Sequence, residues 1–387
     1  MSDNDFMSGS TTFTRNGSTA QIINEGTIRS KIGGYIALLA PEVRNNGIII
    51  AKSGTVALAS GEATSLQFDQ NNKLINVYVS PSLINSLIIN NKAVRADDGL
   101  IILSSQAMND VMAGIIKNSN IDNAGTLKST GGKIILSSSG AINNTGNINV
   151  SSKNLNPGII SFDANKVTLS GTVKANGTGQ NSKGGRIQVT GDILDIKAGA
   201  LLSATGTLGG GTILVGGDWQ GSNNTRQATN VLVEGGATID ASAVKNGNGG
   251  KIVIWSDVNN SNSFTSFNGN IFSNPGFEGG QGGQVETSGH ILSVNGNVNI
   301  GSNGKWLLDP AAVTIATSDS GYTNTSNTYT PNSTVNTVTV NASTITTALN
   351  SGTSITITTT NTGTAGTGAD TITINSALAW TTNASLT

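Results

Sequence analysis

A short motif recurs along this chain of 387 residues about every two dozen positions. Each copy has Asn or Ser, one further residue and Gly, followed by an apolar run, a glycine turn and a second apolar run. The clearest copies are "NEGTIRSKIGGYIALLA" (24–40) and "NNGIIIAKSGTVALAS" (45–60). Their lead glycines, Gly26 and Gly47, are spaced as Gly125 and Gly146 are. Any fold for this chain must therefore accept many similar units in succession.

A repeat of this length made of strands, with no helical spacing, predicts a β-solenoid. Successive coils would stack about 4.8 Å apart and pair their strands in parallel. In "KIILSSSG" (133–140) the alternation directs Ile134 and Leu136 inward and Lys133 and Ile135 outward. Gly and Asn at the corners supply positive φ angles, and asparagines stacked at one corner can form side-chain ladders.

The composition agrees with an elongated repeat rather than a compact globule. The chain has 50 Gly, 4% aromatic and 11% charged residues, which is poor material for a large compact core. Its 36% hydrophobic content is nevertheless too high, and too regularly alternating, for a disordered chain. We therefore predict an all-β solenoid, extended as a rod.

Three stretches depart from the repeat. Residues 61–90 predict a side hairpin that turns at "DQNNK", and residues 104–116 predict a short amphipathic helix from their apolar spacing. Residues 311–387 are rich in Thr, Ser and Asn but still alternate, so we expect further coils there. This gives three expected domains: a β-helix domain with the hairpin and the helix (1–118), shaft repeats (119–310) and a truncated continuation (311–387). Neither end shows a capping segment, so we expect free sheet edges and a chain that is part of a longer one.

Charge and residue usage exclude several classes of function. The net charge is −1 with no basic stripe, which argues against nucleic-acid binding. No apolar run is long enough for a transmembrane helix, and "MSDNDFMSGSTTF" at the start is not a signal peptide. The chain has no Cys, so disulfides and thiolate metal sites are excluded.

Longer stretches resemble a known family. "GTIRSKIGGYIALLAPEVRNNGIIIAKSGTVALASGEATSLQF" (26–68) resembles the second half of the secretion domain of filamentous-haemagglutinin-like exoproteins of bacterial two-partner secretion. "GGKIVIWSD" (249–257), "FNGNIFSNPGFEGGQGGQVETSG" (267–289) and "WLLDPAAVTI" (306–315) resemble the adjoining shaft. Together these matches cover nearly the whole chain from about residue 3 onward.

The resemblance implies a right-handed parallel β-helix in a secreted or cell-surface protein of a Gram-negative bacterium. The implied partner is an outer-membrane β-barrel transporter, and the implied roles are adhesion, self-association and biofilm formation. The family's signal peptide and its early N-P-N-G-like motif do not occur here, since "NLNPG" (154–158) belongs to a later coil. We therefore expect the export determinants in this chain to be incomplete.

Candidate catalytic groups are few. His290 stands in "ETSGHILSV" at a strand start, where a surface or corner role is favoured over catalysis. A polysaccharide-cleaving β-helix needs clustered carboxylates, for which the candidates are Glu62, the "VRADDG" turn (94–99) and the pair Asp192 and Asp195. The turn, with Arg95, Asp97 and Asp98, is typical of a solvated corner, and Asp192 and Asp195 would face opposite sides of a regular strand.

Other features also favour structural roles. The glycine runs at 207–212 and 279–283 precede neither G-K-[ST] nor a helix, so they are weak phosphate loops. The tryptophans fall at strand ends and are expected to fill or flank the core, with carbohydrate stacking as the alternative; they are Trp219, Trp255, Trp306 and Trp380. N-x-[ST] sequons are expected by chance in such a chain; they include Asn16, Asn143, Asn223, Asn324 and Asn341. Threonine-rich strands such as "ITITTT" also resemble ice-binding solenoids, but their register is irregular.

The sequence thus predicts a non-enzymatic adhesin shaft with no catalytic, cofactor-binding or metal-binding residues, no cofactor and no small-molecule substrate. The expected partners are the outer-membrane transporter and host or surface glycans or proteins, with self-association as another possibility. Two alternatives stay open: a β-helix enzyme acting on polysaccharide, favoured if acidic residues of three neighbouring coils converge on one groove, and a structural stalk for a C-terminal effector.

Overall fold

A computed structural model of the chain describes residues 3–108, 113–119, 126–153, 157–317, 322–325, 328–331, 338–359 and 371–387. The chain forms two compact units, Met1–Ala175 and Asn176–Thr387. This division does not coincide with the boundaries expected at residues 118 and 310, so the three-domain division stays a prediction.

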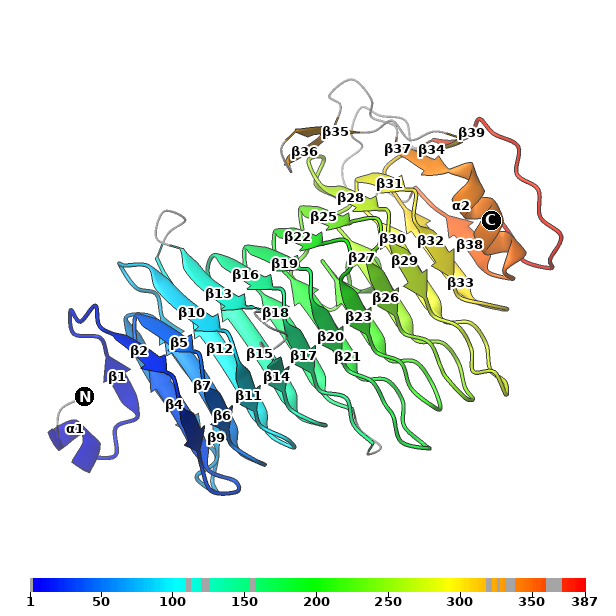
Figure 1. Ribbon diagram of the computed structural model, residues 1–387. Helices are drawn as coiled ribbons and strands as arrows, with labels where there is room; N and C mark the ends of the chain where they lie inside the picture. Colours follow the sequence, from blue (N-terminus) through cyan, green and yellow to red (C-terminus); the bar gives the residue numbers. More distant parts are fainter. Residues whose placement is uncertain are drawn as a thin grey trace. The chain divides into compact units, whose positions relative to one another are not determined.

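Unit 1 is a parallel β-solenoid in which each coil contributes three strands (Figure 1). The first strands of successive coils pair with one another, and so do the second and the third strands. The first strands are β2 (Gln21–Asn24), β5 (Glu42–Asn45), β10 (Ser86–Asn90), β13 (Gly114–Asn118), β16 (Ala141–Asn144) and β19 (Lys166–Leu169). The second strands are β3 (Thr27–Arg29), β6 (Ile48–Ile50), β11 (Ala93–Arg95), β14 (Thr126–Lys128), β17 (Asn147–Asn149) and β20 (Thr172–Lys174). The third strands are β4 (Tyr35–Leu39), β7 (Thr55–Ser60), β12 (Leu100–Ser105), β15 (Lys133–Ser138) and β18 (Ile159–Asp163).

Unit 2 repeats this three-strand coil. Its first strands are β22 (Ile193–Ile196), β25 (Asn230–Val233), β28 (Phe264–Phe267) and β31 (Ile291–Val294). Its second strands are β23 (Leu201–Ser203), β26 (Thr238–Asp240), β29 (Asn270–Phe272) and β32 (Asn297–Asn299). Its third strands are β21 (Arg186–Thr190), β24 (Thr212–Val215), β27 (Lys251–Trp255), β30 (Gln284–Ser288), β33 (Lys305–Asp309) and β38 (Ser354–Ile357). The predicted parallel β-helix is confirmed in both units.

Alternation along the strands builds the core, as predicted. Ile134 and Leu136 of β15 are fully buried, whereas Lys133 is exposed and Ile135 half-buried. The same inward positions hold aliphatic or aromatic side chains in neighbouring coils, such as Ile101 before β15 and Phe162 after it. The interior is therefore a set of stacked apolar rows, one row for each inward position of the coil.

An asparagine ladder closes one corner of unit 1. Each side-chain amide donates from Nδ2 to the Oδ1 of the next coil at 2.7–2.8 Å, and the last amide, Asn144, donates to the Gly146 carbonyl oxygen. The ladder consists of Asn24, Asn45, Asn90, Asn118 and Asn144. The four from Asn45 onward are at most 1% exposed. Their polar groups satisfy one another where water is excluded.

The predicted side hairpin is present but shorter than residues 61–90. Strands β8 (Ala63–Phe68) and β9 (Leu74–Ser80) pair antiparallel, and β1 (Thr12–Thr14) adds to β8. The sheet packs on outward side chains of β7 and β12, including Ala57 and Ile102. Residues 86–90, assigned to the hairpin from sequence, instead form the solenoid strand β10.

The helix predicted at residues 104–116 is wrong wherever that stretch is described. Ser104 and Ser105 end β12 and pair in register with β7 and β15. Residues 114–116 begin β13, paired with β10, and residues 109–112 lie outside the described residues. Hydrogen bonding to the neighbouring coils on both sides outweighs the helical spacing of a few apolar side chains. The described helices lie elsewhere: α1 (Asp3–Met7) and α2 (Ala342–Asn350), with a 3-10 turn η2 (Trp219–Gly221).

The C-terminal region is not the simple run of coils that was expected. The first-strand sheet of unit 2 continues from β31 to β37 (Val338–Asn341), then back in sequence to β34 (Val313–Ala316), and ends with β39 (Ile372–Ile374). Between β34 and β37, β35 (Tyr322–Thr325) and β36 (Thr328–Pro331) form an antiparallel pair. After β37 the chain forms α2, which contacts β32 where another second strand was expected. Asn341 caps this helix by accepting a hydrogen bond from the Ser343 N–H, and Ile345 and Leu349 are buried beneath it.

Candidate functional site

The turn residues predicted as carboxylate candidates join neighbouring coils. Asp98 has a φ of 57°, in the left-handed region that corner residues adopt. Asp97 accepts hydrogen bonds from the backbone N–H and the hydroxyl of Thr130, one coil further on, at 3.2 and 2.7 Å. Arg95 is exposed at the end of β11. This geometry is that of a stacked corner.

The remaining carboxylate candidates from the sequence lie in separate ion pairs. Asp192 pairs with Arg226 at 2.7 Å, whereas Asp195 pairs with Lys197 at 2.6 Å. Lys197 also contacts Glu234 of the next coil at 2.8 Å. Burial opposes the charged form of Lys197, but the hydrogen bonds and charges of Asp195 and Glu234 raise its pKa. These contacts tie β22 to the residues after β25 without gathering free carboxylates in one place.

Glu62 lies beside a groove of unit 1. The groove holds about 270 Å³ and is lined by residues of β1, β2, β8 and the end of β4 with the residues that follow it, among them Phe13, Ile22 and Pro41. Arg15 forms an ion pair with Glu62 at 2.9 Å across its wall. The lining is mixed, with one ion pair among apolar side chains, which is typical of a contact surface more than of a reaction site.

Glycine runs of unit 2 form close-packed corners and not phosphate loops. A Cβ at Gly210 would lie 1.7 Å from the Ala241 carbonyl oxygen, and one at Gly282 would lie 2.0 Å from that of Ile300. Only glycine fits between coils stacked this closely. The corners border a groove of about 380 Å³ whose rim carries Lys251 and Lys305 among amide side chains.

The single histidine and the tryptophans have structural contacts. Nδ1 of His290 lies 2.9 Å from the Val258 carbonyl oxygen. Trp306 is 1% exposed and donates to the Thr287 hydroxyl, and Trp255 is 2% exposed and donates to Gln227. Trp219 is half-buried in η2 and Trp380 lies after β39, where it donates to the Ala384 carbonyl oxygen.

Two sequon asparagines use their side chains in folding. Asn223 donates to Asp218 at 2.9 Å, and Asn341 caps α2. Asn16 lies in a turn with a φ of 49°, and Asn143 is half-buried in β16. Side-chain contacts of Asn324 lie outside what the structure describes.

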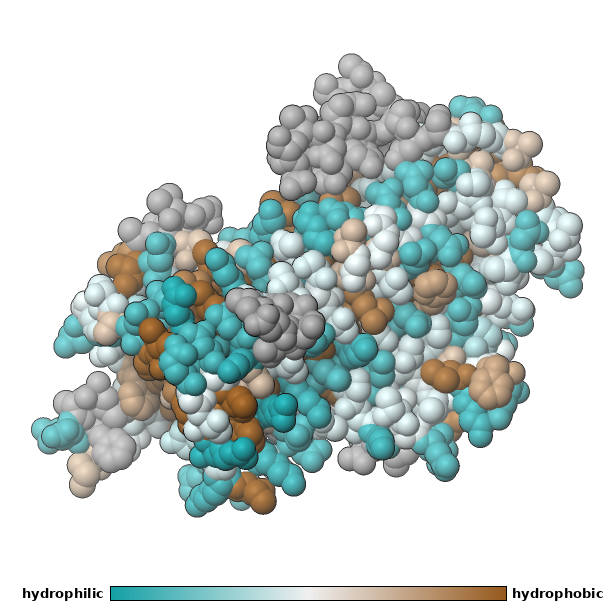
Figure 2. Space-filling model, viewed as in Figure 1, coloured by the Kyte–Doolittle hydropathy of each residue, from teal (hydrophilic) through white to brown (hydrophobic). Residues whose placement is uncertain are grey.

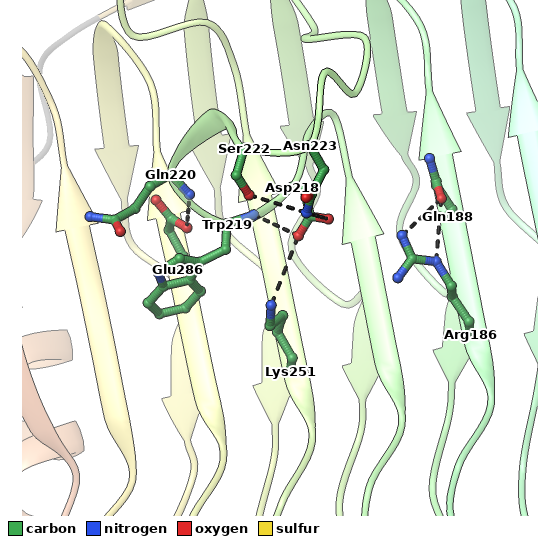
Figure 3. A network of polar contacts seen from close by, with 9 residues as sticks. All are labelled: Arg186, Gln188, Asp218, Trp219, Gln220, Ser222, Asn223, Lys251 and Glu286. Carbon is green, nitrogen blue, oxygen red and sulfur yellow. Dashed lines mark hydrogen bonds and ion pairs between the residues drawn. The ribbon is translucent and has the colours of Figure 1, made fainter. Parts of the chain in front are cut away.

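The most unusual polar group was not predicted from the sequence. Glu286 points outward from the middle of β30, yet it is fully buried (Figure 3). Its Oε2 accepts from the Gln220 backbone N–H at 2.9 Å, and its Oε1 accepts from the Ser288 hydroxyl at 3.0 Å. Burial, with a smaller contribution from the charge of Asp309, raises the pKa of Glu286 to about 7. The sequence signal was indirect: residues 216–228 form a long insertion between β24 and β25.

This insertion covers the outer face of β24, β27 and β30. Within it, Asp218 accepts from the Trp219 N–H at 2.8 Å and from Asn223. Burial of Asp218 favours its neutral form, but these hydrogen bonds and the positive charge of Lys251 lower its pKa. Nζ of Lys251 lies 3.9 Å from Asp218 and 5.8 Å from the centre of the Trp219 ring.

The carboxylates of this region do not form an open acidic groove. Asp218, Glu286 and Asp309 come from three different coils, but each is at most 7% exposed. A polysaccharide-cleaving site requires carboxylates that reach the sugar. Across the described ranges, no three His, Cys, Asp or Glu side chains gather so as to hold a metal ion. Within the same ranges, no helix has the length and apolar character needed to cross a membrane.

Comparison with known proteins identifies a solved structure of the same kind. No family model and no curated protein sequence matches the chain. The crystal structure of the HMW1 secretion domain from Haemophilus influenzae matches with a TM-score of 0.54 and 25% sequence identity. The match covers 80% of this chain and 72% of that one. The chain is thus similar over most of its length to a bacterial secretion domain, and the resemblance to filamentous-haemagglutinin-like exoproteins of two-partner secretion is confirmed.

Proposed function

We propose that this chain is part of a two-partner-secreted exoprotein, in which it forms secretion-domain and shaft coils that present a non-enzymatic adhesive surface. The observation that carries the proposal is the match of four fifths of the chain to a secretion domain. The expected partner is an outer-membrane β-barrel transporter, and the expected location is outside the cell or on its surface.

The surface of the solenoid supports an adhesive role. Asn, Ser, Thr and Gly are frequent at the corners and recur at outward strand positions such as Asn147 and Asn149, and Figure 2 shows hydrophilic and near-neutral residues over most of the face in view. Large apolar side chains are exposed both on loops, such as Phe277 and Val244, and on strands, such as Tyr78 of β9. A surface rich in hydroxyl and amide groups suits hydrogen-bonded contact with glycans or with other solenoids. We therefore propose attachment, aggregation or biofilm formation as its role.

Attachment assays in the source bacterium test this proposal. Deleting the gene should reduce attachment to surfaces and biofilm mass, and the intact gene should restore both. A gene carrying Ile134→Asp, which places a charge in the core of β15, should fail to restore them, whereas Lys133→Asp on the outward face of the same strand should succeed.

Two results would contradict the proposal. Attachment that is unchanged by the deletion would remove the adhesive role. Release of reducing sugar ends from acidic polysaccharides by the purified chain would overturn its non-enzymatic part, and favour the enzyme alternative.

A further inference from the structure

The insertion between β24 and β25, residues 216–228, forms a closed loop over the outer face of the third-strand sheet in unit 2. We call it the latch loop. The Ala228 N–H donates to the Gly216 carbonyl oxygen at 2.8 Å, which brings the two ends of the loop together. From its centre the Gln220 N–H reaches Glu286, and from its end Gln227 accepts from the Trp255 indole at 2.9 Å. The loop is thus attached to β27 and β30 by specific polar contacts (Figure 3).

The sheet face beneath the latch loop is apolar. Leu214 of β24 with Val253 and Trp255 of β27 form a buried cluster, against which Trp219 of the loop packs. All three strand residues point away from the solenoid core, so without the loop they would face water. Opening the loop would therefore expose an apolar strip that includes one tryptophan.

The latch loop is held in a strained conformation. Gln220 has a φ of 51° and a ψ of 39°, in the left-handed region that few residues other than Gly, Asn and Asp adopt. Asn223 and Asn224 also have positive φ angles. The conformation of Gln220 accompanies the direct hydrogen bond of its N–H to the carboxyl of Glu286. Strain of this kind persists where the surrounding contacts enforce it.

Burial under the loop disfavours the ionised form of Glu286 and outweighs the hydrogen bonds from Gln220 and Ser288, which favour that form; the neighbouring charges act in both directions. From β33, Asp309 and Lys305 point to the same outer face, and β27 contributes Lys251. Lys251 is already engaged by Asp218 of the loop, at 3.9 Å, which reduces the positive charge that it offers to Glu286. No water reaches the carboxyl while the loop is closed, because the residue is 0% exposed. An ionised Glu286 gains hydration only if the loop moves away.

We propose that residues 216–228 are a proton-controlled latch: protonated Glu286 keeps the loop closed, and loss of the proton favours an open loop that exposes Trp255 and Val253. The raised pKa of Glu286, about 7 in the closed loop against an ordinary value of 4.5, supports this assignment. Because the Glu286 carboxyl binds its proton more tightly when the loop is closed, it stabilises the closed loop at pH values below its ordinary pKa of 4.5. That stabilisation is lost as pH rises through the pKa of the closed form.

Hydrogen exchange measured by mass spectrometry on the full chain tests the latch. Rates for peptides covering residues 216–228 are measured at about pH 4.5 and about pH 8.5 and corrected for the intrinsic pH dependence of exchange. We expect protection of the loop to fall by on the order of 100-fold at the higher pH, the change that a pKa shift from 4.5 to about 7 allows. Glu286→Gln, which cannot ionise, should remain protected at both pH values. Glu278→Gln, at an exposed loop tip, should behave like the wild type.

A second variant keeps the test decisive if Glu286→Gln does not fold. Asp309→Asn removes the neighbouring negative charge that helps to raise the pKa of Glu286, so it should reduce the pH-dependent loss of protection. Equal protection of the wild-type loop at the two pH values would overturn the proposal. So would a pH-dependent loss that is unchanged in Glu286→Gln, or in Asp309→Asn where only that variant folds.

Discussion

Replacing Asn90 by Ala should destabilise the middle of unit 1 strongly. Asn90 is fully buried in the asparagine ladder, between Asn45 and Asn118. Its Oδ1 accepts from Asn45 at 2.8 Å, and its Nδ2 donates to Asn118 at 2.8 Å and to the Lys92 carbonyl oxygen at 2.9 Å. Removing the amide leaves one donor of Asn45 and one acceptor of Asn118 without their ladder partners, whereas the Lys92 carbonyl oxygen keeps the hydrogen bond from the Thr126 N–H.

The cost follows from these two orphaned groups. A buried polar group left without a partner costs about 1–3 kcal/mol, so the variant should lose about 4 kcal/mol of local stability. Asn24→Ala is the matched control, because Asn24 ends the ladder, is 7% exposed and serves only one ladder neighbour. Its replacement should cost about 1 kcal/mol, since water can reach the group that is freed.

Native-state hydrogen exchange measures this difference coil by coil, which suits a repeat protein whose coils unfold partly independently. The amides of β10 and β13 should exchange on the order of 1000-fold faster in Asn90→Ala, the rate equivalent of about 4 kcal/mol. They should change little in Asn24→Ala. Equal effects of the two substitutions would refute the reasoning, because they would show that the ladder interior gains nothing from its exclusion of water.

Three further predictions concern packing. Gly47→Ala should lower stability by about 2 kcal/mol in thermal unfolding, because its Cβ would lie 2.0 Å from the Gly26 carbonyl oxygen. Gly26→Ala is the control and should change stability by less than about 0.5 kcal/mol, because no atom lies within 4 Å of the added Cβ. Similar melting curves for the two variants would contradict this prediction. Trp306→Ala should lower the free energy of unfolding by about 3–5 kcal/mol, because this side chain is 1% exposed and fills the core. A change below about 1 kcal/mol in denaturant unfolding would contradict this role. Ile345→Asp should detach α2 from β32 and so expose the edge of the sheet that ends at β32. The exposed edge should increase self-association, measured by light scattering. A variant that stays monodisperse would contradict a covering role for α2.

Much of the solenoid was predictable because one repeat specifies both register and faces. The alternation in "KIILSSSG" placed Ile134 and Leu136 inside, and the recurrent asparagines indicated a corner ladder. Both features depend on neighbours that repeat the same pattern, so one correct coil predicts the next. The corner roles of Asp97 and Asp98 followed from their position before Gly99.

Helices were harder to predict, because spacing alone does not show which partner a segment finds. Residues 104–116 carry helical spacing, but Ser105 and Ile115 take strand positions beside existing coils. Residues 342–350 alternate like a strand in part, yet Asn341 caps a helix there and Ile345 is buried below it. In both places the decisive contacts come from other coils.

Glu286 was invisible to sequence reasoning for a related reason. In "QVETS" it occupies an outward position, where a charged residue normally meets water. Its burial depends on the latch loop, which starts some seventy residues earlier and reaches it through a single backbone N–H of Gln220. A local pattern cannot show that a distant insertion covers one strand of the sheet.

The measurement that tests the account most directly is the location of this chain in its source bacterium, with and without the outer-membrane transporter. Antibodies raised against residues 157–317 would label intact cells and culture medium of the wild type and of a strain that lacks the transporter gene. The account predicts labelling outside the cell in the wild type and its loss in the deletion strain. Chain that remains inside wild-type cells, or that reaches the surface without the transporter, would contradict it.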